Sequence, residues 1–148
     1  MSDPSPRPGV LVLNGPNLNR LGQREPDVYG ALTLGDLEAD LRQRFPDLAL
    51  RFEQHSGEGA LIDALHAAAD DGTAGVAFNP GGYAHTSVAL RDAVASIPVP
   101  VVEVHVSNVY AREPFRHASL LSAVCAGVVT GFGVAGYALA VRYLADRA

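Results

Sequence analysis

The chain carries the letters VLVLNGPN at residues 10–17, four apolar residues followed at once by polar and turn-forming ones. The same pattern returns twice, as GVAFNPGG at residues 75–82 and as VVEVHVSN at residues 101–108. Short, continuous apolar runs are typical of strands buried in a parallel sheet. Because ligands bind beyond the carboxyl ends of such strands, the three polar ends are predicted to meet at one pocket.

Strand and helix patterns alternate around these runs, which favours βαβ units. The predicted strands are residues 10–13, 48–54, 75–78, 99–106 and 127–130. The predicted helices are residues 34–45, 61–69, 87–95 and 134–145, with a turn or short helix at 113–121. Thr33 and Asp36 form a capping box for the first helix, and Ser56 is expected to cap the second. We predict a flavodoxin-like three-layer α/β sandwich with a five-stranded parallel sheet in the order 2-1-3-4-5. Residues 9–148 are expected to form this single domain, after a frayed tail at residues 1–8.

The composition argues against several classes of function. The chain has 11 positively charged side chains and every one is an arginine, so a lysine Schiff base and a Walker-type phosphate loop are excluded. The net charge of −5 disfavours a nucleic-acid partner. No long apolar run predicts a membrane span and no charged-then-apolar leader is visible, so a cytoplasmic location is expected.

The third apolar run places an acid and a base on one strand face. Glu103, His105 and Ser107 are two residues apart, so the carboxylate can orient the imidazole and fix its tautomer. A histidine in an apolar strand is more often a satisfied core residue, but the donors that follow favour a functional role. Among them, Arg112 and Arg116 have the spacing to share one face of a helical turn, either solvated or clamping an anion.

The connection over residues 14–32 is long and without periodicity, whereas most βα loops hold about two to six residues. It carries Arg24 and Tyr29. An ordinary tyrosine is a poor base at neutral pH, but a neighbouring guanidinium favours its phenolate form. The loop is either a lid that brings this pair over the pocket or a solvent-exposed insertion.

Two further motifs match the patterns of a dinucleotide site and a metal site, but each match is incomplete. GFGVAG at residues 131–136 matches the dinucleotide pattern GxGxxG, but the further strand and acidic residue of that fingerprint are missing, so close helix–strand packing is preferred. His85, His105 and Glu103 could imitate a two-histidine, one-carboxylate metal site, but no typical ligand spacing supports it. We therefore expect no metal.

Read together, the motifs resemble those of the type II 3-dehydroquinate dehydratases. The resemblance rests on LNGPNL at 13–18, LGQREP at 21–26 with YG at 29–30, NPGGY at 79–83, HTSVALRD at 85–92, EVHVSN at 103–108 and ARE at 111–113. It implies a flavodoxin-like fold and a cofactor-free lyase that converts 3-dehydroquinate to 3-dehydroshikimate and water through an enolate. It places the enzyme in the shikimate (aromatic amino-acid) or quinate pathway.

The resemblance also implies roles for individual residues. Tyr29 removes the C2 proton, Arg24 holds it as phenolate, and Asn17 helps to stabilise the enolate. His105, oriented by Glu103, protonates the departing C1 hydroxyl. The implied substrate ligands are Asn79, His85, Val106, Ser107, Arg112 and Arg116, joined by Asp92, which reaches into a neighbouring subunit's site.

The family assembly is a dodecamer of four trimers, so a homo-oligomer is expected. A non-catalytic flavodoxin-like module that binds a small acid is the alternative from another class. The complete set of chemical residues argues against that alternative.

Overall fold

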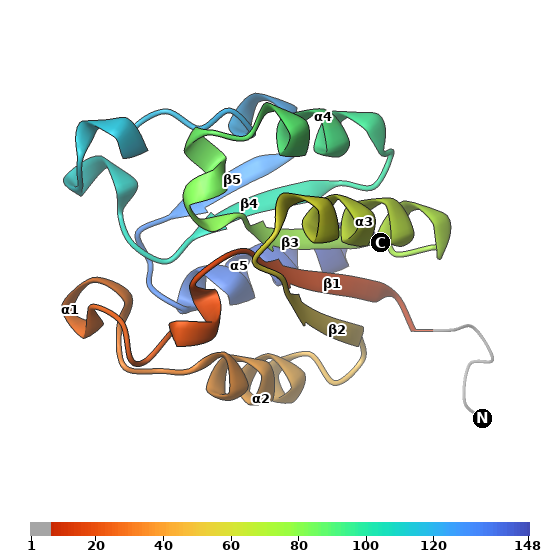
Figure 1. The fold of residues 1–148 in the computed structure, drawn as a ribbon. Helices are drawn as coiled ribbons and strands as arrows, with labels where there is room; N and C mark the ends of the chain where they lie inside the picture. Colours follow the sequence, from red (N-terminus) through yellow and green to blue (C-terminus); the bar gives the residue numbers. More distant parts are fainter. Residues whose placement is uncertain (1–6) are drawn as a thin grey trace.

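The computed structural model describes residues 7–148 and shows a five-stranded sheet covered by helices on both faces (Figure 1). All strand pairs are parallel. The strands are β1 (Gly9–Asn14), β2 (Ala49–Gln54), β3 (Gly75–Asn79), β4 (Val101–His105) and β5 (Gly127–Thr130). Their order, β2-β1-β3-β4-β5, confirms the predicted flavodoxin-like topology. Strand β2 lies on one side of β1 and β3 lies on the other, so the order in which strands are added reverses between β1 and β3. Such folds open a binding crevice at this point.

The long helices divide between the two faces of the sheet. They are α2 (Leu34–Arg44), α3 (Glu58–Asp70), α4 (Val88–Ser96) and α5 (Ala135–Arg147). On one face α2 and α5 bury side chains against Val10 and Val12 of β1. On the other face α3 and α4 pack against Leu11 and Leu13 of the same strand. Because successive strand residues point to opposite faces, the unbroken apolar run of β1 serves both cores.

Local sequence explains where most of these elements begin. The capping box of Thr33 and Asp36 is confirmed, and Ser87 caps α4 through the backbone N–H of Leu90. The predicted Ser56 cap is wrong, because α3 begins after Gly57 without a side-chain cap. The predicted strand at 99–106 is also too long, since pairing with β3 and β5 spans only the residues of β4.

Six short helical turns lie in the connections between these elements. They are η1 (Leu18–Arg20), α1 (Pro26–Tyr29), η2 (Gly81–His85), η3 (Val109–Ala111), η4 (Pro114–Arg116) and η5 (Ser122–Val124). The first two lie in the loop over residues 14–32, where no periodicity predicted them, because one turn is too short to produce an amphipathic pattern. Pro26 at the first position of α1 supplies a pre-set backbone angle for that turn.

Two glycines permit close approach of neighbouring segments. A side-chain carbon on Gly15 would lie 2.5 Å from the carbonyl oxygen of Pro80, so the loops after β1 and β3 can touch only with glycine there. A side-chain carbon on Gly136 would lie 3.1 Å from Val129, which supports the packing interpretation of the GFGVAG motif.

The predicted tail at residues 1–8 lies mostly outside the described residues. Within them, Arg7 donates to the carbonyl of Pro46, and the carbonyl of Pro8 accepts from Ala49. No helix among residues 7–148 has both the length and the apolar character needed to cross a bilayer.

Candidate active site

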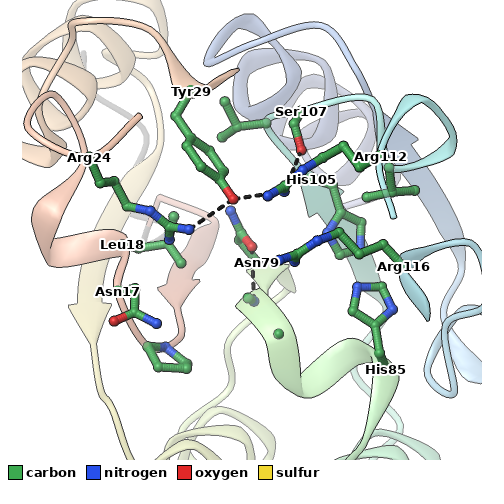
Figure 2. A pocket seen from close by; sticks show the side chains of 15 residues that line it. Asn17, Leu18, Arg24, Tyr29, Asn79, His85, His105, Ser107, Arg112 and Arg116 are labelled. Carbon is green, nitrogen blue, oxygen red and sulfur yellow. Dashed lines mark hydrogen bonds between the residues drawn. The ribbon is translucent and has the colours of Figure 1, made fainter. Parts of the chain in front are cut away.

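A cavity opens at the carboxyl ends of β1, β3 and β4, where the sequence predicted one (Figure 2). Its volume is about 130 Å³, which suits one small molecule rather than a dinucleotide. Every predicted site residue except Glu103 and Asp92 lines it: Asn17, Arg24, Tyr29, Asn79, His85, His105, Val106, Ser107, Arg112 and Arg116. The loop over residues 14–32 therefore covers the pocket rather than projecting into solvent.

The hydroxyl of Tyr29 is held between two guanidinium groups (Figure 2). Arg24 donates from Nη2 at 2.9 Å and Arg112 donates from Nη1 at 2.7 Å. Arg24 also lies over the tyrosine ring, 4.1 Å from its centroid, and the tyrosine side chain is buried. Two permanent cations at this oxygen can stabilise a negative charge that develops on it during a reaction.

Two residues of this loop adopt left-handed backbone angles. Asn17 has φ 71° and Glu25 has φ 36°, and both precede a helical turn. Side chains other than glycine adopt such angles at a cost in free energy, so the surrounding contacts must hold them. Glu25 lies 3.8 Å from Arg112, which ties the loop to the segment after β4.

The direct contact of Arg112 with Tyr29 was missed by the sequence analysis. Arg112 and Arg116 have the spacing for one helical turn but do not share one, because Arg112 has extended backbone angles between η3 and η4. Arg112 reaches Tyr29 and also donates to Ser107 at 3.1 Å, whereas Arg116 pairs with Glu113. No local signal could have shown this, since the two partners are 83 residues apart.

His105 and Glu103 form a buried pair on one face of β4, as their spacing predicted. The Nε2–H of His105 donates to Oε2 of Glu103, so Nδ1 is the ring nitrogen available to a ligand. Burial raises the pKa of Glu103, but the hydrogen bond and charge of His105, with hydrogen bonds from Ser122 and Ser119, outweigh burial and leave that pKa below its ordinary value. The ring of His85 stacks on His105 with centroids 6.2 Å apart.

Asn79 is fixed from behind by a buried tyrosine of α5. The hydroxyl of Tyr137 accepts from Asn79 at 2.8 Å and donates to Asn14 at 2.6 Å. Asn79 also accepts from the backbone N–H of Gly81 at 3.1 Å. Complete burial raises the pKa of Tyr137 well above its ordinary value, so it stays a neutral phenol. This network joins the ends of β1 and β3 and orients Asn79 at the cavity wall.

Tyr137→Phe is expected to lower the free energy of unfolding by about 1–3 kcal/mol, because it leaves the amides of Asn14 and Asn79 buried without that partner. Denaturant titration measures the change. Tyr143→Phe, on an exposed part of the same helix, is the matched control and should stay within about 0.5 kcal/mol of the parent. Equal stability of the two variants would contradict a stabilising role for the buried hydroxyl.

Two predicted residues lie away from the cavity. Glu103 is behind His105 and acts on the site only through that ring. Asp92 is exposed on α4 and pairs with Arg91 at 3.0 Å, so within one subunit it does not reach the pocket. Among residues 7–148, no three His, Cys, Asp or Glu side chains are grouped closely enough to hold a metal ion.

Comparison with known proteins agrees with this geometry. The family model for class II dehydroquinases matches residues 8–145. A 3-dehydroquinate dehydratase from Exiguobacterium sp. is 59% identical over 139 residues, covering 93% of this chain and 94% of the relative. The Bacillus pumilus 3-dehydroquinate dehydratase is 59% identical over 142 residues, covering 95% and 96%. The crystal structure of a type II dehydroquinase from Propionibacterium acnes superposes with a TM-score of 0.89 at 44% identity, covering 93% of this chain and 96% of that one. The chain belongs to the class II dehydroquinase family.

Proposed function

We propose that this protein dehydrates 3-dehydroquinate to 3-dehydroshikimate through an enolate, without a cofactor. The observation that carries the proposal is the Tyr29 hydroxyl, held by two guanidiniums in the same cavity as a carboxylate-backed imidazole. Base and acid catalysis at one pH needs two groups in different electrostatic environments, and this cavity offers such a pair.

Tyr29 is the base in this proposal. The hydrogen at C2 of the substrate is next to the C3 ketone, so its removal leaves an enolate. The phenolate form of Tyr29, favoured by Arg24 and Arg112, takes that proton. The side chain of Asn17 lines the cavity and stabilises the developing negative oxygen, directly or through a water.

His105 is the acid that completes the elimination. The enolate re-forms the ketone as the C1–O bond breaks, and His105 supplies the proton that lets the hydroxyl depart as water. Glu103 holds the ring by one nitrogen and leaves the other to face the substrate. One turnover leaves Tyr29 protonated and His105 deprotonated, so a proton must return from the first residue to the second through solvent.

The other lining residues bind the substrate. The carboxylate of 3-dehydroquinate suits Ser107 and the backbone N–H groups of Val106 and Ser107, and its hydroxyls suit Asn79, His85 and Arg116. Arg112, which bridges Tyr29 and Ser107, couples the base to the carboxylate subsite.

An oligomer belongs to the same proposal. Asp92 serves a neighbouring subunit's site, and a dodecamer of four trimers is the assembly that we propose. Exposed Val88 lies one turn before Asp92 on α4, so an apolar contact can form beside the carboxylate. We also propose one catalytic domain over residues 9–148 and a cytoplasmic location, where the unpaired thiol of Cys125 is kept reduced.

The direct test is to add 3-dehydroquinate to purified protein and follow the ultraviolet absorbance of the conjugated product. The same preparation is examined by sedimentation. Product formation by a dodecamer is the expected result, and a fully active monomer would contradict the role of Asp92. Tight substrate binding by calorimetry with zero turnover would instead favour a binding module.

A further inference from the structure

The carboxylate of Glu103 has three hydrogen-bond donors, and they are divided between its two oxygens. Oε2 accepts from His105, whereas Oε1 accepts from Ser122 Oγ at 2.8 Å and from Ser119 Oγ at 3.1 Å. Only 1% of the Glu103 surface is exposed. An ionised carboxylate at such a place is stable only when it is paired and hydrogen-bonded.

Both serines are held by the segment that follows η4. The Oγ of Ser119 also accepts from the backbone N–H of Leu121 at 3.1 Å, which fixes its rotamer. Leu121 is fully buried, and Ser122 begins the turn η5. The neighbouring Leu120 N–H donates to the carbonyl of Ala84 at 2.7 Å, so the segment is anchored to η2. The two hydroxyls are therefore preorganised rather than free to rotate toward solvent.

We propose that Ser119 and Ser122 are positioning residues that keep the Glu103 carboxylate ionised and turned so that Oε2 meets His105. Neither serine lines the cavity, so neither touches the substrate. Their effect on turnover passes through Glu103 to the imidazole. That consequence for turnover depends on the proposed dehydratase function, whereas the state of the carboxylate does not.

Removing the two hydroxyls leaves Oε1 of the buried Glu103 without its two side-chain donors. The ionised form of Glu103 then loses stabilisation relative to the protonated form, so the pKa of Glu103 rises. A protonated carboxyl holds the ring more weakly, because its hydrogen bond with the imidazole is no longer assisted by the carboxylate charge.

Other titratable groups lie near the pair. Cys125, in the loop before β5, faces Glu103, but burial and that carboxylate raise the pKa of Cys125 to about 12, so the thiol stays neutral. On the cavity side, His105 meets His85, and the guanidiniums of Arg112 and Arg116 line the same space. None of these groups donates to Oε1, which leaves the serines as its donors among the described residues.

The test uses the double variant Ser119→Ala with Ser122→Ala in the full chain. The acid limb of the pH profile of kcat/KM should move to higher pH by about one unit, because each hydroxyl stabilises a charged group. The single variant Ser122→Thr keeps a hydroxyl, so its acid limb should lie close to that of the parent. Ser96→Ala is the matched control, since that hydroxyl donates to the carbonyl of Ala93 on its own helix.

Infrared difference spectra of the substrate-free protein give a second readout. The carbonyl stretch of a protonated Glu103, identified by its loss in Glu103→Gln, should appear at higher pH in the double variant than in the parent. If the carbonyl stretch shifts in this way but the parent does not convert 3-dehydroquinate, the serine role is supported and the dehydratase function is rejected. An unchanged carboxyl titration would overturn the serine role whatever the activity. Each single variant should shift in the same direction by less, so a poorly folding double variant does not prevent the measurement.

Discussion

Tyr29→Phe is expected to reduce kcat by about 100- to 10,000-fold, because it removes the oxygen that accepts the C2 proton. The change deletes one atom and keeps the ring on which Arg24 lies, at 4.1 Å from the centroid. Arg112 keeps its hydrogen bond to Ser107. KM should therefore change by only a few-fold. Steady-state kinetics together with calorimetric binding of the substrate separate the two effects.

The matched control is Tyr143→Phe, which also removes a hydroxyl that accepts from an arginine, Arg147, but on the exposed surface of α5. It should keep the parent kcat. Proton exchange gives a sharper test. In deuterated water the Tyr29→Phe variant should exchange the C2 hydrogen of the substrate as slowly as it forms product, since both need the same base. Exchange at the parent rate would reject Tyr29 as the base.

Much of the fold could be predicted from the sequence because its signals are local. Four apolar residues followed by NGPN indicate a buried strand, and Thr33 with Asp36 indicates a helix start. The order of the sheet then follows from the short connections between strands and helices. The errors lie where local signals compete or are absent. Ser56 had the right chemistry for a cap, but it precedes the true cap position by one residue.

The site was predictable to the extent that parallel strands bring their ends together. That rule alone places Asn79 and His105 on one cavity. The contacts that tune them could not be predicted in this way. Tyr137 and Asn14 are 123 residues apart, and Ser122 and Glu103 are 19 apart. A tyrosine in an apolar helix or a serine in a turn gives no sign of its partner, because the pairing is decided by how helices and loops pack on the sheet.

His105→Gln is expected to reduce kcat by about 100- to 10,000-fold through loss of the acid. An amide at this position can still donate to Glu103, so the buried carboxylate keeps a partner and the fold is preserved. The amide cannot supply a proton to the departing hydroxyl. Steady-state kinetics measure the loss, and His66→Gln, exposed on α3, is the control that should leave kcat unchanged.

The two catalytic variants should differ in one measurable step. With Tyr29 intact, the His105→Gln variant still forms the enolate and returns a proton to C2. In deuterated water it should therefore exchange the C2 hydrogen faster than it releases product, whereas Tyr29→Phe should not. Equal loss of exchange in both variants would mean that His105 is needed before the enolate forms, and the assignment of base and acid to separate steps would be wrong. An excess of exchange over elimination in the histidine variant alone is the result that distinguishes a stepwise route through an enolate from a concerted loss of water.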